Sequence, residues 1–347
     1  MSKSSKWAVI IVAAVIIIAV VVGLRKPAEE EIAEVPAETL KAAMVTDVGG
    51  LGDESFNDAA YKGLKEAEEE LDFEITVVES KKMDDYEPNL RSLGDQDTDI
   101  SWAIGFLLTD AVDTVASEYP ELKFGLIDSV VEQPNVASVT FKEEEGSFLL
   151  GVIAAKMSET GTVGFVGGME VPVIEHFDVG FHAGVIAANP DIKVLRGYSG
   201  KFDDPAKGKE VALAQFNQGA DIIFHASGAC GLGVIEAAKE QGDGYWAMGV
   251  DSCQHHLAPE NVMSCMMKRV DVAVFDVTKK VKDETFEPTH YVFGLAEDGV
   301  GPCDKTSEHV PEEVLDEVEK YKEMIVNGEL TVPSTFTELE AFTPPSE

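Results

Sequence analysis

Polar and aromatic residues follow several short apolar runs, at the points where those runs end. Asp47, Asp110 and Asp251 each end or follow such a run, and Phe56 and Asn57 stand near the start of the first helical pattern. Carboxylates accept hydrogen bonds from hydroxyl groups and ring nitrogens, and aromatic faces stack on flat rings. This combination is typical of a site for a neutral, hydroxylated ligand that carries a ring.

A glycine-rich turn, GACGLG at residues 228–233, opens another helical pattern. Its spacing is GxxGxG, whereas dinucleotide-binding helices carry GxGxxG, so the turn argues only weakly for a dehydrogenase. We expect Gly228 instead to let the backbone come close to a bound ligand.

Other kinds of chemistry find little support in the sequence. The pairs His176 with His182 and His255 with His256 lack a third ligand at a recognisable metal spacing. No nucleophile elbow, Ser-His-Asp order or P-loop is present. The sequence therefore predicts a protein that is not an enzyme, has no metal site and needs no cofactor.

The elements that must position these residues alternate between strands and helices. From residue 40 onward, β-rich apolar runs of about five residues alternate with longer helical patterns, and the pattern restarts near residue 143. Such alternation predicts two α/β halves, each with a parallel sheet. In open parallel sheets ligands bind at the carboxyl ends of the strands. The expected strands lie at residues 42–46, 74–78, 102–105, 123–127, 136–140, 162–167, 193–198, 221–226, 245–251, 262–266 and 290–294.

Two of the polar residues also have structural interpretations. Ser55 with Asp58 three residues later resembles an N-cap followed by a carboxylate, so we expect Ser55 to be structural. Asp110, at the head of a predicted helix, is either a ligand contact or an N-cap.

The charge of the chain limits its partners. It has 347 residues, of which 27 are basic and 64 acidic, for a formal net charge of −37. A polyanion needs clustered Lys and Arg, so nucleic acid is not an expected partner. Hydrophobic residues make up 45% of the chain, which is enough for a sizeable core and for two domains.

The amino-terminal segment has the length and character of a membrane anchor. Residues 7–24 contain no charge and no proline, and basic residues flank them on both sides. This run can cross a bilayer, and it lacks the small-residue cleavage site of a signal peptide. We predict an uncleaved signal anchor over residues 1–26, an acidic linker over 27–40 and an extracytoplasmic remainder at the cell membrane. A cleaved signal peptide is the alternative.

Four cysteines fall in the last third of the chain, and none forms a CxxC pair. They are Cys230, Cys253, Cys265 and Cys303. Metal-ligand spacing is absent. An extracytoplasmic location permits disulfides, and buried free thiols are the equal alternative.

Seven segments resemble, in the same order, the basic membrane protein family of ABC-transporter substrate-binding proteins, which includes the purine nucleoside receptors. The resemblance extends from about residue 42 to residue 276. The segments are DVGGLGDESFNDAAYKGL, TFKEEEGSFLLGVIAA, GFVGGMEVPVIEHFDVGFHAGV, FDDPAKGK, GADIIFHASGACGLGVIEAAKE, GVDSCQ and MKRVDVAVFD.

The resemblance implies a type I periplasmic-binding-protein fold, with two doubly wound lobes joined by hinge crossovers. Lobe one would comprise residues 41–140 and about 270–305, and lobe two residues 141–269 and about 306–335. A monomer would capture a nucleoside, with a purine nucleoside as the leading candidate, and deliver it to a permease and its ATPase subunit. The alternative is a membrane-tethered sensor of the same fold that binds a sugar or another ligand.

The resemblance also implies roles for single residues. Phe56 and Phe177 would form opposite walls of a slot for the base, although Phe177 can also be ordinary helix core. Asn57, Asp251 and Lys268 match the family's polar contacts.

Opposite charges at positions 251 and 268 would allow those two side chains to pair with each other and with ribose, and a surface salt bridge is the alternative for both. Asp47, at the end of the first strand, would accept hydrogen bonds from ribose or the base, and a loop-capping carboxylate is its alternative. One departure stands out: Cys253 occupies the position at which the family commonly carries an acidic residue.

Overall fold

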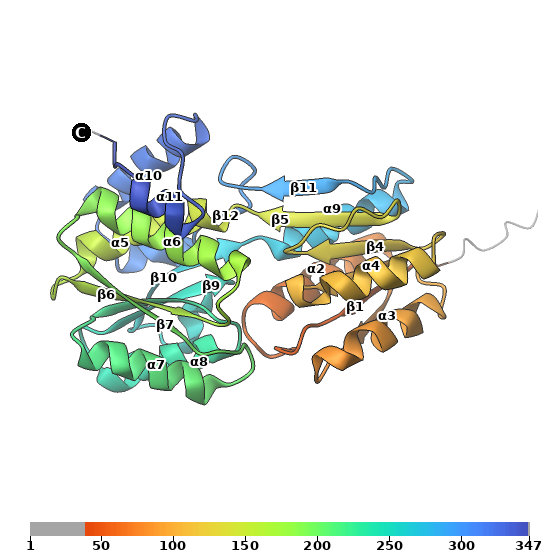
Figure 1. Cartoon of the computed structure of the whole chain (residues 1–347), viewed down its shortest axis with the longest axis horizontal. Helices are drawn as coiled ribbons and strands as arrows, with labels where there is room; N and C mark the ends of the chain where they lie inside the picture. The colour runs from red at the N-terminus through yellow and green to blue at the C-terminus, as the bar shows by residue number, and fades with distance from the viewer. Residues whose placement is uncertain (1–38, 346–347) are drawn as a thin grey trace, which may run out of the picture. The chain divides into compact units, whose positions relative to one another are not determined.

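The computed structural model describes residues 39–345 (Figure 1). The predicted anchor and nearly all of the predicted linker lie outside the described residues. Within residues 39–345, none of the helices combines the length and the apolar character needed to cross a bilayer.

The first lobe is built on a six-stranded parallel sheet with the order β11-β5-β4-β3-β1-β2. Alternate residues of β1 face opposite ways: Ala42 and Met44 join one hydrophobic cluster, and Ala43 and Val45 join another. Helices α2 and α9 pack together, as do α3 and α4. The elements are β1 (Lys41–Val45), α2 (Phe56–Leu71), β2 (Glu74–Val78), α3 (Tyr86–Gly94), β3 (Ile100–Ile104), α4 (Thr109–Glu118), β4 (Lys123–Ile127), β5 (Val136–Phe141), α9 (Val270–Lys282) and β11 (His290–Phe293).

The second lobe repeats this plan with the strand order β12-β10-β9-β8-β6-β7. All neighbours are parallel except β10 and β12. Helix α5 packs against α6, and α7 packs against α8. The elements are α5 (Glu143–Met157), β6 (Thr162–Gly167), α6 (Pro172–Ala188), β7 (Lys193–Tyr198), α7 (Pro205–Asn217), β8 (Ile222–Ala226), α8 (Cys230–Gln241), β9 (Trp246–Asp251), β10 (Val262–Lys268), β12 (Val300–Pro302), α10 (Glu312–Val326) and α11 (Phe336–Ala341). The predicted α/β fold with two parallel-dominated sheets is confirmed.

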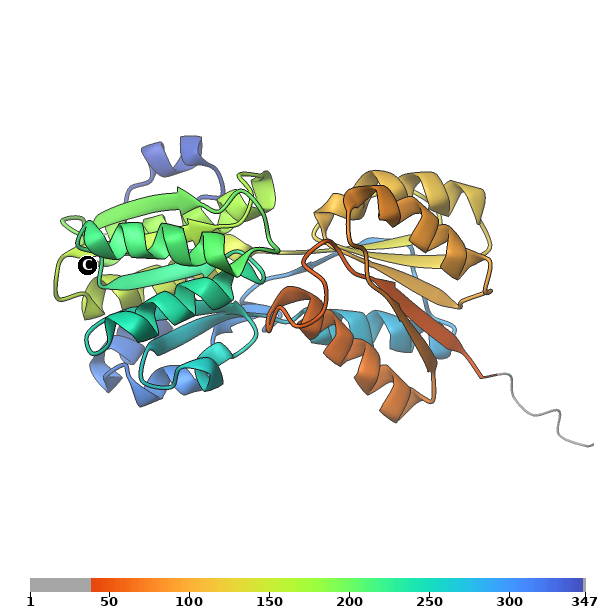
Figure 2. The ribbon, with the colours of Figure 1, turned by 90° about the horizontal axis from the view of Figure 1, so that it is seen from below.

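The chain passes between the two sheets three times, as Figure 2 shows. The passages follow β5, β10 and β11. Backbone hydrogen bonds tie them together: Lys142 N donates to Phe293 O (2.9 Å) and Arg269 N donates to Gly299 O (2.8 Å). The chain returns to the second lobe earlier than expected. Residues 300–302, which form β12, fall in the range expected for lobe one but pair with β10 in the second sheet.

Helices α5 and α6 approach each other at glycines. A Cβ at Gly151 would lie 2.1 Å from the carbonyl oxygen of Phe181, and one at Gly184 would lie 1.9 Å from that of Phe148. No side chain fits at either position, so the two backbones are in direct contact. Helix α5 is accordingly buried along most of its length.

Candidate functional site

A cavity lies where the carboxyl ends of strands from both lobes meet. The first lobe contributes the ends of β1, β3 and β4 and the start of α2, and the second contributes the start of α6 and the ends of β8, β9 and β10. Its lining includes seven of the eight predicted residues: Asp47, Phe56, Asn57, Phe177, Gly228, Asp251 and Lys268.

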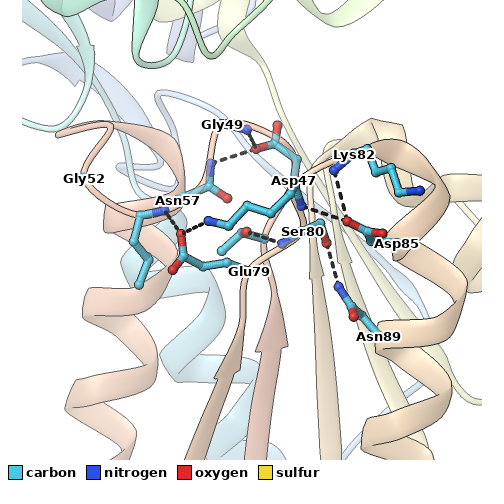
Figure 3. Close-up of polar contacts among 12 residues, drawn as sticks. Asp47, Gly49, Gly52, Asn57, Glu79, Ser80, Lys82, Asp85 and Asn89 are labelled. Atoms are coloured by element: carbon cyan, nitrogen blue, oxygen red, sulfur yellow. Dashed lines mark hydrogen bonds and ion pairs between the residues drawn. The ribbon is translucent and has the colours of Figure 1, made fainter.

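Asp47 and Asn57 form a buried polar network in the first lobe, part of which is drawn in Figure 3. Gly49 N and Asn57 Nδ2 each donate to Asp47 Oδ1 at 2.8 Å. Asn57 Nδ2 also donates to Asp53 Oδ2 at 3.1 Å. Burial raises the pKa of Asp47 to about 6, even though both of its hydrogen bonds favour the carboxylate.

Asp53 caps the helix that carries Phe56. Its carboxylate accepts hydrogen bonds from the backbone N–H groups of Ser55, Asn57 and Asp58. These bonds satisfy donors that have no partner within the helix. The loop before α2 is therefore fixed by its own carboxylates, and the start of the helix is held at the cavity.

Ser55 does not form the predicted side-chain cap. It is the N-cap residue by position, but its hydroxyl makes no capping bond. Instead Ser55 Oγ donates to Asp251 Oδ2 at 2.5 Å, which joins the two lobes. Asp58 accepts from Gly52 N and Glu54 N. The N-cap prediction failed because the nearby Asp53 satisfies the helix donors, which leaves Ser55 for a contact that sequence spacing cannot reveal.

Lys268 is a buried cation at the end of β10. Its Nζ atom donates to Asp128 Oδ2 at 2.6 Å and lies 2.9 Å from Glu143 Oε1. The side chain is only 1% exposed, so the surface salt bridge considered from sequence is ruled out for this residue. Burial would lower the pKa of Lys268, but the surrounding carboxylates hold it above its usual value. The ammonium group therefore stays charged.

The expected direct pair between Asp251 and Lys268 is replaced by partners from the other lobe. Asp251 is bonded to Ser55, and Lys268 to Asp128. Burial raises the pKa of Asp251 to about 7 and that of Asp128 to about 6. Asp251 ends β9 and Asp128 directly follows β4, and both have a left-handed backbone, with φ of 63° and 65°.

Aromatic rings surround the Lys268 ammonium group. The ring centroids of Phe56 and Phe177 lie 5.2 Å and 5.4 Å from Nζ, within cation–π range. Phe177 lines the cavity and also packs against Phe224 in the core. Phe181, one turn further along the same helix, is fully buried in the core.

Gly228 has φ of +54°, a backbone conformation that favours glycine. A Cβ there would lie 3.3 Å from atoms of Phe202, another lining residue. The glycine thus allows the turn before α8 to pass close to the cavity.

Asp110 does not reach the cavity. It is exposed in the first turn of α4 and is absent from the lining. A short 3₁₀ turn, Phe106–Leu108, separates the end of β3 from this helix, so Phe106 occupies the place expected for Asp110.

Sequence reasoning missed other lining residues, among them Asp53, Phe106, Asp128 and Phe202. Asp128 carried a usable signal, because it directly follows the strand KFGLI and obeys the same strand-end rule as Asp47.

Sequence comparisons place the chain among transport proteins. The family model for PnrA-like ABC transporter substrate-binding proteins matches residues 40–335. Basic membrane protein A1 of Borrelia garinii subsp. bavariensis is 37% identical over 312 residues, which cover 88% of this chain and 92% of the relative. The ABC transporter nucleoside-binding protein BmpA of Lactococcus lactis subsp. cremoris is 36% identical, with 85% and 89% covered.

A solved structure agrees with this placement. An ABC transporter solute-binding protein from Aeropyrum pernix K1 superposes with a TM-score of 0.81 at 28% identity, covering 87% of this chain and 96% of the other. Proteins of this kind bind substrates rather than convert them, so the prediction that the chain is not an enzyme is confirmed. By sequence and by fold, the chain belongs to the family of PnrA-like ABC transporter substrate-binding proteins.

Proposed function

We propose that the cavity binds a nucleoside, with a purine nucleoside preferred, and that the protein delivers it to an ABC permease. In this proposal the binding lobes are extracytoplasmic, tethered to the cell membrane by the amino-terminal segment. The nucleoside-binding relative supports the ligand class.

The observation that carries the proposal is a pair of unsatisfied acceptors beside two aromatic rings. Asn57 Oδ1 and Asp128 Oδ1 are buried and have no hydrogen-bond partner among the described residues. Both residues line the cavity. A buried acceptor without a partner costs about 1–3 kcal/mol, so the site favours a ligand that brings hydroxyl or N–H donors.

Asp47 adds a third place for a donor. Both of its side-chain hydrogen bonds go to Oδ1, and no bond to Oδ2 is found within residues 39–345. Ribose hydroxyls can donate to the carboxylates while the base occupies the slot between Phe56 and Phe177. A free sugar would satisfy the acceptors but would leave the aromatic faces without a flat partner.

Calorimetry with residues 39–347 tests this function, because residue 39 begins a compact unit. The ligands are purine and pyrimidine nucleosides, their free bases and ribose. We expect a purine nucleoside to bind most tightly. Binding of ribose or an unrelated sugar with no response to any nucleoside would contradict the assignment while leaving the fold intact.

Phe56→Ala tests the slot directly. Loss of base stacking should weaken nucleoside binding by about 1–3 kcal/mol. Phe342→Ala is the matched control, because Phe342 is similarly half-buried but packs on Phe148 away from the cavity. Equal affinities for the two variants would remove Phe56 from the binding site.

A further inference from the structure

Three of the four cysteines converge in the second lobe, away from the cavity lining. Cys253 lies in the turn after β9, Cys265 lies within β10, and Cys303 directly follows β12. Their sulfur atoms all lie within 4.8 Å of one another. Each carries a free thiol. The absence of a CxxC pair hid this cluster, because its members are 12 or more residues apart in sequence.

Strand pairing holds the cluster in place. Cys265 pairs with Gly249 of β9 in the parallel ladder, and the next residue, Met266, pairs with Pro302 of β12. Cys303 N donates to Cys265 O at 2.9 Å, and Gln254 N donates to Cys265 Sγ at 3.2 Å. The thiols therefore come together as a consequence of the sheet itself.

The spacing suits a metal ion bound by sulfur. Zinc–sulfur bonds of about 2.3 Å in tetrahedral geometry place sulfur atoms about 3.8 Å apart, so only small side-chain movements would bring these thiols into ligating positions. Cys265 and Cys303 are buried, and Cys253 is partly exposed.

A surface cavity lined by Cys253, Cys303 and Asp304 gives an ion access from solvent.

We propose that Cys253, Cys265 and Cys303 bind one thiophilic metal ion, represented by Zn²⁺, with a fourth coordination position open to the surface cavity. The ion would tie the turn after β9 to β10 and β12. Cys253 lies two residues after Asp251, which contacts the other lobe. A disulfide would use two of the three sulfurs and leave the third unpaired, whereas a metal ion uses all three.

Metal titration of the full chain tests this site without reference to any nucleoside. The protein is reduced with a phosphine, stripped of metal, and titrated with Zn²⁺ in competition with a chromogenic chelator. In a separate experiment, Co²⁺ is added in place of Zn²⁺ as a spectroscopic probe. We expect one equivalent of either ion and, with Co²⁺, the near-ultraviolet absorption of sulfur-to-metal charge transfer.

Single substitutions identify the ligands. Cys253→Ser and Cys303→Ser should each weaken Zn²⁺ binding by at least about 100-fold, since loss of a direct ligand should cost no less than loss of an outer-shell partner. Cys230→Ser is the matched control, because that thiol contacts Lys201 O and Asp204 N and lies outside the cluster. It should bind Zn²⁺ like the unaltered chain.

A folding readout accompanies these titrations. Zn²⁺ should raise the melting temperature of the unaltered chain and of Cys230→Ser, but not that of Cys303→Ser. Failure of the fully reduced chain to bind Zn²⁺, or unchanged binding by Cys303→Ser, would overturn the proposal. Co²⁺ binding without sulfur charge-transfer absorption would overturn it as well.

Discussion

The two walls of the cavity are held in different ways. In the first lobe, Asp47 and Asn57 are fixed by hydrogen bonds to their own loop and helix. In the second lobe, Asp251 is bonded to Ser55 of the first lobe, and Lys268 is bonded both to Asp128 of the first lobe and to Glu143 of its own.

This difference suggests a division of labour in binding. The hydrogen bonds of Asp47 and Asn57 lie within the first lobe and do not depend on contact between the lobes, whereas the bonds from Ser55 to Asp251 and from Lys268 to Asp128 form only when the lobes meet. A ligand held by both walls would therefore stabilise the closed arrangement through contacts that the open one lacks.

Of the predicted changes, removal of the buried Lys268 cation should have the largest effect. Lys268→Met leaves the buried carboxylates of Asp128 and Glu143 without their partner, so we expect the free energy of unfolding to fall by about 3–5 kcal/mol. Urea denaturation followed by circular dichroism measures this change.

Lys156→Met is the control for that variant. Lys156 pairs with Glu317 in a site where both side chains are about one-third exposed, so its loss should cost less than about 1 kcal/mol. Equal losses of unfolding free energy for the two variants would mean that the buried ion pairs of Lys268 stabilise the fold no more than a partly exposed pair does.

Asp47→Asn should separate affinity from stability. The variant retains the size of the side chain but loses a charged acceptor, so nucleoside binding should weaken by about 1.5–3 kcal/mol. The free energy of unfolding should change little, because burial already disfavours the charge. Calorimetry measures the nucleoside affinity, and urea denaturation of the same sample measures the free energy of unfolding. Parallel losses of both quantities would show that Asp47 supports the fold rather than the ligand.

Ser55→Ala should weaken the contact between the walls while leaving each wall intact. Removal of the hydroxyl takes away one hydrogen bond to Asp251, so nucleoside affinity should fall by about 0.5–1.5 kcal/mol. X-ray scattering should show a more open ligand-free protein. Ser117→Ala, which removes an exposed hydroxyl bonded to Thr114 O, should change neither quantity.

Acidification should change stability and binding in opposite directions. The folded pKa of Asp251 is about 7 and its reference value is 3.8, so the folded state binds more protons between these values. The cost of ionising this buried group is absent below about pH 4 and complete above about pH 7. Its contribution to the free energy of unfolding should therefore rise as the pH falls from 7.5 to 5.5.

Nucleoside binding should weaken over the same range, because Asp47 and Asp128, whose pKa values are both about 6, become protonated and accept hydrogen bonds less well. The Asp251→Asn variant separates the titration of this one carboxylate from that of the acidic surface. The melting temperature of the variant should rise less on acidification than that of the unaltered chain. An identical pH dependence of the two melting temperatures would contradict the assignment of this pKa.

Much of this architecture was predictable from the sequence because it depends on local patterns. Buried parallel strands appear as short apolar runs, and their carboxyl ends place Asp47 and Asp251 at the cavity. Asp128 also follows a strand directly, so the same rule could have predicted it as a lining residue. Asp110 was misplaced because a 3₁₀ turn follows β3 before the next helix begins.

The contacts between distant segments were beyond that reasoning. Ser55 and Asp251 are 196 positions apart, and Lys268 and Asp128 are 140 apart. The cysteine cluster likewise depends on which strands become neighbours. Such contacts are set by strand order, which spacing along the chain does not encode.

The glycine contacts between α5 and α6 have a mechanical consequence. With backbone against backbone at Gly151 and Gly184, there is no layer of side chains that can slide, so shear between these helices is blocked. The second lobe should then turn as a rigid body. Opening of the cleft would be confined to torsion changes in the three short passages near residues 142, 269 and 294–299, which act together as one hinge.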